Sequence, residues 1–83
     1  MYKVSLTSSS EKQLIRLPDF AYLKIRRIIN LLKETPFPAG CKKLNNLEGY
    51  RIRMGKYRIL YNVNNSSKSI IVYKIGHRKD VYR

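Results

Sequence analysis

The sequence predicts an α+β fold: two N-terminal helices packed on one face of a small, twisted, mainly antiparallel four-stranded sheet. Three observations lead to this class. The chain opens on an alternating segment, continues with two segments of helical spacing, and ends in three more alternating runs. The order is therefore β-α-α-β-β-β, and it leaves one face of the sheet without helices. With 83 residues, the chain is predicted to be a single domain, residues 1–83, with one small core and little room for an enclosed pocket.

The first strand and the first helix follow from local patterns. Residues 2–6 alternate apolar and polar side chains, which predicts a half-buried strand. Ser8 and Glu11 have the spacing of a capping box, so a short helix is expected over residues 9–17. Pro18 would end it, because proline cannot continue a helix.

A second helix is expected over residues 20–34, with Asp19 as its cap. Its apolar positions recur at helical spacing and predict a buried side. They are Ile25, Ile28, Ile29 and Leu32. Lys24, Arg26, Arg27 and Lys33 occupy the other positions. We interpret them as a solvated basic face, with direct RNA contact as the alternative.

Residues 49–61, GYRIRMGKYRILY, have the pattern of a β-hairpin. Tyrosine, isoleucine and methionine occupy one parity, and Gly55-Lys56 interrupts the run as a short turn would. Arg51, Arg53 and Arg58 fall on the other parity, so the hairpin gathers them on one surface. Cations this close repel one another, and we therefore expect this surface to bind a polyanion.

The last strand is expected over residues 69–75, after a polar loop. Ile71, Tyr73 and Ile75 share one parity, and Lys74 falls on the other together with Ile70 and Val72. Both parities are apolar in the first half, which predicts a central strand. The tyrosines of these strands are interpreted as core residues rather than platforms for stacked bases.

The charge of the chain points to an anionic partner. Its 18 basic and 5 acidic residues give a formal net charge of +13. Residues 49–83 hold nine of the basic residues and one acidic residue, so the excess is greatest there. Nucleic acid, an anionic membrane and an acidic protein all fit a charge of this size.

Several function classes are disfavoured by what the sequence lacks. One cysteine excludes an intrachain disulfide and a cysteine-based metal site, and one histidine excludes a histidine cluster. No zinc pattern, glycine-rich phosphate loop, Ser-His-Asp set or paired carboxylates are found. No metal or cofactor is therefore expected. There is no apolar run of membrane length and no signal peptide, so we expect a protein of the reducing cytosol.

The remaining arginine, lysine and tyrosine side chains suit one reaction in particular. RNA can be cleaved without a metal by its own 2′-hydroxyl, which already lies beside the scissile phosphate. The protein then has to orient the strand, move protons and stabilise the added negative charge. Guanidinium groups perform the last task well, because they bind phosphate oxygens in a bidentate manner.

The hairpin GYRIRMGKYRILYNV and the terminal IGHRKDVYR, in this element order, resemble the RelE toxins of the RelE/ParE superfamily. The resemblance covers nearly the whole chain. It implies a type II toxin–antitoxin toxin, active in the cytoplasm as a ribosome-dependent endoribonuclease that cuts mRNA in the ribosomal A site. It also implies neutralisation by a RelB-like antitoxin in a hetero-oligomer.

Matching positions imply roles for five residues. Arg51 and Arg53 correspond to two basic residues of the RelE hairpin, often lysines. Arg58 and Arg78 correspond to active-site arginines, and Tyr82 to a tyrosine that stacks on the mRNA or exchanges protons with it. Arginine stays protonated, so neither strand arginine can be a general base.

Other basic side chains are expected to contact RNA. They are Lys42, Lys43, Lys56, Lys74, Lys79 and Arg83. His77 could carry protons, but its parity favours a structural role at the end of the sheet. Three alternatives stay open. The arginines could be ordinary exposed strand residues, the chain could inhibit DNA gyrase as ParE toxins do, or it could be a non-catalytic basic binding module.

Overall fold

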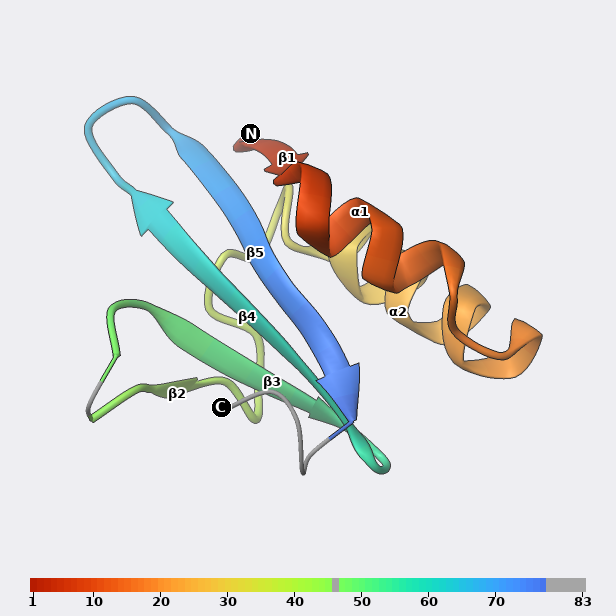
Figure 1. Cartoon of the computed structure of the whole chain (residues 1–83). Helices are drawn as coiled ribbons and strands as arrows, with labels where there is room; N and C mark the ends of the chain where they lie inside the picture. Colours follow the sequence, from red (N-terminus) through yellow and green to blue (C-terminus); the bar gives the residue numbers. More distant parts are fainter. Residues whose placement is uncertain (46, 78–83) are drawn as a thin grey trace.

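The computed structural model describes residues 1–45 and 47–77, and it contains the two expected layers. Both helices lie on one side of a twisted sheet (Figure 1). The elements are β1 (Lys3–Leu6), α1 (Ser8–Ile15), α2 (Asp19–Leu31), β2 (Lys42–Lys43), β3 (Tyr50–Met54), β4 (Tyr57–Asn64) and β5 (Ser69–His77). The α+β class and the order of the predicted elements are therefore confirmed.

The sheet has five strands in the order β1-β5-β4-β3-β2. β5 lies between β1 and β4, as its doubly apolar sequence predicted, and it pairs in parallel with β1. The other pairs are antiparallel. The additional strand, β2, is only two lysines long and pairs with β3. A pattern of alternation needs more residues than that, so it could not have been read from the sequence.

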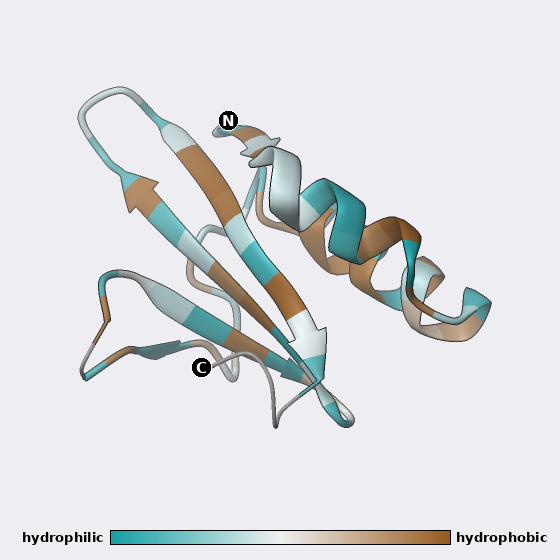
Figure 2. Ribbon diagram, in the orientation of Figure 1, coloured by the Kyte–Doolittle hydropathy of each residue, from teal (hydrophilic) through white to brown (hydrophobic). Residues whose placement is uncertain are grey.

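The core lies between α2 and the helix-facing side of the sheet. Ala21, Ile25 and Ile29 of α2 are buried at spacings of four residues, which puts them on one side of the helix. They pack with buried strand residues, among them Ile52 and Ile59. Along β3, apolar and polar segments alternate, as the hydropathy colouring shows (Figure 2).

The start of α1 differs from the expectation by one residue. Thr7 is the N-cap, and its Oγ1 accepts a hydrogen bond from the Ser10 backbone N at 3.2 Å. With the cap at Thr7, Ser10 is fully buried and its hydroxyl donates to the Val72 carbonyl at 2.8 Å. This bond ties α1 to β5, which explains why the predicted Ser8 cap was wrong. Asp19 likewise is the first residue of α2 rather than its cap.

The predicted parity of β5 was wrong in its second half. Leu60 pairs with Lys74 and Tyr61 with Val72, so the register shifts by one residue at Tyr73, as in a β-bulge. The core residues of β5 are consequently Ile70, Val72 and Ile75, while Ile71 is 46% exposed. Ile71 and Tyr73 are themselves apolar, and they hid this irregular spacing in the sequence.

Gly49 is the position in the loop before β3 where a side chain would disturb the fold most. Its φ is +105°, and a Cβ there would collide with the Tyr61 carbonyl oxygen and the Asn62 side chain. Gly40 has a similar φ of +89° but open space around it. The pair therefore separates backbone strain from steric collision.

We predict that Gly49→Ala lowers the free energy of unfolding by at least about 2 kcal/mol, since strain and collision add. The matched control Gly40→Ala should lower it by only about 1 kcal/mol, from strain alone. Urea denaturation of the two variants and the wild type measures both values. Equal losses in the two variants would contradict the close approach of Gly49 to β4.

Candidate nucleic-acid interface

The β3–β4 hairpin turns its arginines away from the helices. Ile52 pairs with Ile59, and both are buried in the core. The next pair along the hairpin is Arg53 with Arg58, which must therefore project from the opposite face. Arg51 lies two residues from Arg53 on the same strand and shares its face. The register thus places all three arginines on the helix-free side.

Two lysines extend this arrangement across the sheet. Lys42 of β2 pairs with Arg51 of β3. Arg51 pairs in turn with Leu60 of β4, and Leu60 pairs with Lys74 of β5. Paired residues share a face, so this row crosses four strands with three cations and one apolar side chain. We call Lys42, Arg51, Arg53, Arg58 and Lys74 the cationic array. None of the four strands β2, β3, β4 and β5 contains an aspartate or a glutamate within its bounds.

Arg58 is the most buried cation of the array, with 5% of its surface exposed. Its Nη1 donates to the Tyr57 carbonyl at 3.0 Å and to the Gly55 carbonyl at 3.3 Å. The tight turn therefore holds this guanidinium in place. Arg53, directly opposite, is exposed and can reach a ligand without rearrangement. The pair combines one fixed and one accessible guanidinium.

Tyr73 is a residue of this side that the sequence reasoning missed. The bulge places it next to Lys74, and its hydroxyl donates to the Glu48 carbonyl at 2.7 Å. Glu48 belongs to the loop between β2 and β3, and this bond holds the loop against β5. The only sign of this position in the sequence was the uneven spacing of the apolar residues Ile70, Val72 and Ile75, which departs from strict alternation.

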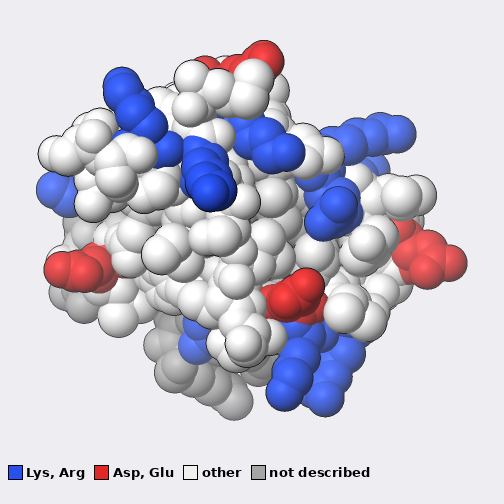
Figure 3. Space-filling model, turned by 90° about the horizontal axis from the view of Figure 1, so that it is seen from above, with Lys and Arg blue, Asp and Glu red and all other residues white. Residues whose placement is uncertain are grey.

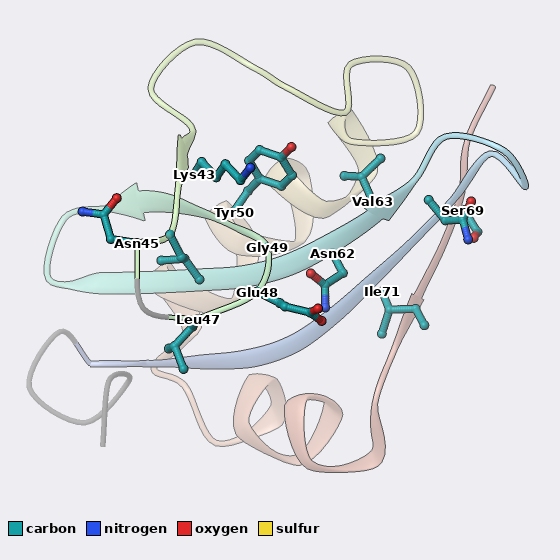
Figure 4. Close-up of a pocket in the computed structure, with 12 residues that line it drawn as sticks. Lys43, Asn45, Leu47, Glu48, Gly49, Tyr50, Asn62, Val63, Ser69 and Ile71 are labelled. Atoms are coloured by element: carbon teal, nitrogen blue, oxygen red, sulfur yellow. The ribbon is translucent and has the colours of Figure 1, made fainter.

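The same loop borders an open groove of about 880 Å³. Leu47 and Glu48 from the loop, Asn62 from β4 and Ile71 from β5 line it (Figure 4). Lys43 also lines the groove, and it lies beside Tyr50 rather than beside the arginines. The predicted RNA-binding residues are therefore not all together.

The other predicted residues are placed as follows. Lys56 is exposed in the hairpin turn, next to the array in sequence. Arg78, Lys79, Tyr82 and Arg83 lie outside the described residues. His77 pairs with Tyr57 at the end of the sheet, and the two ring centroids are 6.0 Å apart in an edge-to-face contact.

Tyr61 is unsuitable as a general base. It is fully buried in the core, and its hydroxyl donates to the Pro36 carbonyl at 2.8 Å. Burial and, secondarily, a hydrogen bond with Cys41 raise the pKa of the phenol above its usual value. Its expected role as a core residue agrees with this environment.

Basic side chains are not confined to the array. Seen from above, lysines and arginines project at several places over the surface, and acidic side chains are fewer and separate (Figure 3). Among residues 1–45 and 47–77, no three His, Cys, Asp or Glu side chains come together as a metal site would require. Neither helix of this described part has the length and apolar character needed to cross a membrane.

Comparison with known proteins shows where this fold belongs. The family model of the ParE toxin of the type II toxin–antitoxin system parDE matches residues 4–82. The chain belongs to the RelE/ParE superfamily of type II toxin–antitoxin toxins. It is 31% identical over 86 aligned residues to a protein named as a RelE1 toxin in Methanocaldococcus jannaschii, covering 99% of this chain and 96% of that one. It is 26% identical to the toxin RelG of Mycobacterium tuberculosis, covering 99% and 97%.

Solved structures of the superfamily have the same architecture. The archaeal RelE–RelB complex of Pyrococcus horikoshii contains a chain 29% identical to this one, with a TM-score of 0.82 over 95% of this chain and 97% of that one. The RelBE2 complex of Mycobacterium tuberculosis gives 25% identity and a TM-score of 0.80, covering 93% and 98%. The fold of this toxin is therefore that of RelE proteins over nearly its full length.

The raised pKa of Tyr61 predicts a loss of stability in alkali. The folded toxin keeps the phenol proton, whereas the unfolded chain releases it above about pH 10. The contribution of this phenol to the free energy of unfolding is thus fully present below pH 10. Above pH 10 it falls by up to about 1.4 kcal/mol per pH unit. Tyr61→Phe should remove this part of the slope. Denaturant titrations of wild type and variant across this range measure the change; identical slopes for Tyr61→Phe and wild type would contradict it.

Proposed function

We propose that this toxin is a ribosome-dependent endoribonuclease that cleaves mRNA in the ribosomal A site without a metal. The cationic array on the helix-free face of the sheet is the observation that carries the proposal. Relatives named RelE, aligned over nearly the whole chain, support the same reaction class. The ribosome and its mRNA are then the partners, and the cytoplasm is the place of action.

In the proposed reaction, the ribose 2′-oxygen attacks the adjacent phosphorus as it loses its proton. The bond to the 5′-oxygen of the next nucleotide breaks, and that oxygen receives a proton. The products are a 2′,3′-cyclic phosphate and a 5′-hydroxyl. Negative charge grows on the phosphoryl oxygens during this step, so fixed cations stabilise the transition state more than the substrate.

The residues of the cationic array would have different roles in this reaction. Arg58, oriented by two turn carbonyls, supplies a fixed guanidinium, and Arg53 opposite supplies an accessible one. Arg51 and the lysines of its row bind the backbone of the bent strand. Arg78 and Tyr82 complete the site in this proposal.

Proton transfer requires a group other than the strand arginines. A guanidinium group does not serve as a base in proteins, so the arginines of the hairpin do not accept the 2′-hydroxyl proton. Tyr61 is buried and keeps its own proton. We therefore assign proton transfer to Tyr82, with His77 or a ribosomal group as alternatives. Lys43, Lys56, Lys79 and Arg83 would contact RNA phosphates around the site.

A cognate, RelB-like antitoxin is the second proposed partner. Relatives of this fold have been solved as RelE–RelB complexes. A net charge of +13 favours an acidic protein partner on electrostatic grounds. Association of the two chains would give a hetero-oligomer in which cleavage is suppressed.

Inhibition of DNA gyrase is a second candidate function, because the family model that matches the chain is named for ParE. A supercoiling assay with purified gyrase separates the two. Loss of supercoiling at toxin concentrations that leave translated mRNA intact would replace the nuclease proposal.

We predict that Arg53→Ala lowers the rate of mRNA cleavage by roughly 100-fold, as removal of a transition-state donor does in other enzymes. Primer extension on an mRNA translated in a reconstituted system measures new 5′ ends. The matched control is Arg27→Ala, which removes the same charge from an exposed site on α2. Equal rates for Arg53→Ala and Arg27→Ala would refute the role of the array. Equal cleavage of naked RNA would refute ribosome dependence.

A further inference from the structure

The open groove beside the β2–β3 loop lies on the same face of the sheet as the cationic array. Along β4, Arg58 and Asn62 alternate with the core residues Ile59 and Tyr61, so both belong to the helix-free side. Asn62 pairs with Ile71 of β5, which puts Ile71 on this face as well. Arg58 and Asn62 are about 13 Å apart along the strand. An RNA strand held by the array can therefore reach the groove within a few nucleotides.

Residues 47–49 form one wall of this groove, and three contacts hold them in place. The Gly49 carbonyl accepts a hydrogen bond from the Leu44 backbone N at 2.9 Å. Gly49 has no side chain and lies directly against the backbone of β4. The Tyr73 hydroxyl reaches across β4 from β5 and donates to the Glu48 carbonyl at 2.7 Å. The wall is thus fixed before a ligand arrives, which lowers the entropic cost of binding.

Two large apolar side chains are exposed in the groove. Leu47 of the wall and Ile71 of β5 have 47% and 46% of their surface exposed, and neither belongs to the core. In the close-up, Glu48 and Asn62 lie between them (Figure 4). Folding does not account for the exposure of either apolar residue. Together they offer contact to a flat apolar group.

Asn62 is the groove residue of β4 that keeps its amide available. Asn64 Oδ1 accepts a hydrogen bond from the Ser67 backbone N at 3.0 Å, and the Ser67 and Ser69 hydroxyls are 2.7 Å apart. The side chain of Asn62 forms no hydrogen bond with another described residue. It therefore offers both a donor and an acceptor to a ligand in the groove.

Glu48 gives the groove a chemistry unlike that of the array. It is the one acidic residue of the sequence between Glu34 and Asp80, and it is exposed at the groove. A carboxylate repels phosphate, so this place does not suit a further phosphate contact. It accepts hydrogen bonds from amino groups, as the amide oxygen of Asn62 also does. Cytosine, adenine and guanine carry an exocyclic amino group on their edge, whereas uracil does not.

We infer that the groove is a subsite for one unpaired base of the mRNA, and that it favours a base with an exocyclic amino group over uracil. The faces of the base contact Leu47 and Ile71, and Glu48 and Asn62 accept hydrogen bonds from its amino group. The phosphates of the same strand lie on the array. A nucleotide separates its charge from its base in the same way, which is why RNA fits this face better than a peptide. The inference rests on the proposed function for mRNA as the substrate.

The test compares two uniform oligonucleotides of eight nucleotides, 2′-O-methyl oligo(C) and 2′-O-methyl oligo(U). Methylation blocks the attacking hydroxyl, so neither is cleaved. The two carry the same charge and differ only in the hydrogen-bonding groups of one base edge. Fluorescence anisotropy measures their binding to the full-length toxin. The subsite predicts that oligo(C) binds about five- to tenfold more tightly than oligo(U).

Variants locate the preference in the groove. Glu48→Gln and Asn62→Ala should each reduce the preference for oligo(C) to about twofold or less, because an acceptor of the amino group is lost. The matched control Glu34→Gln removes the same charge from an exposed position outside the groove. It should strengthen the binding of both oligonucleotides equally and leave their ratio unchanged. Circular dichroism verifies that the variants fold.

Several outcomes would overturn the inference. They are equal binding of the two oligonucleotides by the wild type, an unchanged preference in both Glu48→Gln and Asn62→Ala, or an equal loss of preference in Glu34→Gln. Conversion of a toxin dimer to a monomer by Leu47→Ser with Ile71→Ser, seen by analytical ultracentrifugation, would assign the groove to a second copy of the chain instead.

The same experiment separates this inference from the proposed function. Arg53→Ala should weaken the binding of both oligonucleotides by the same factor and keep the preference. A preference for oligo(C) in a toxin that cleaves no translated mRNA would overturn the nuclease proposal and leave the groove as a binding site for single-stranded RNA. Cleavage of translated mRNA by a toxin without this preference would overturn the subsite alone.

Discussion

The pairing of Arg53 with Arg58 across the β3–β4 ladder is the constraint on which the rest of this surface depends. Like charges directly opposite one another destabilise a strand pair. The hairpin tolerates them because the neighbouring pair, Ile52 with Ile59, is buried against the helices on the other face. Apolar burial on one side thus holds the cations together on the other. The turn carbonyls that receive the Arg58 guanidinium add a second restraint.

Because of its β-bulge, β5 contributes apolar residues to the core on one face of the sheet and a lysine to the other face. Strict alternation from the buried Val72 would point Lys74 into the core, where an ammonium group is costly to bury. Leaving Tyr73 out of the register shifts Lys74 to the face of Leu60 and returns Ile75 to the core. The same irregularity presents Tyr73 to the β2–β3 loop. A single extra residue therefore maintains the core and completes the cationic row.

Sequence reasoning succeeded where one residue type marked each face and failed where it did not. In β3, arginine alternates with apolar residues, so face and register could be predicted from parity alone. In β5, Ile71 and Tyr73 are as apolar as the true core residues, and parity carried no information. The Thr7 cap depended on a distant acceptor in β5, which no local pattern reports. The common face of the three hairpin arginines could be predicted for the first reason, and the contribution of Tyr73 was hidden for the second.

A chain of 83 residues has little interior to spare for a site, so the binding surfaces proposed for it lie on its outer faces. On the sheet face, the cations stand on rigid paired strands, which suits a substrate that must be held in one geometry. Next to them, the groove combines apolar side chains with an amide and a carboxylate, which suits a group recognised by contact and hydrogen bonding rather than by its charge.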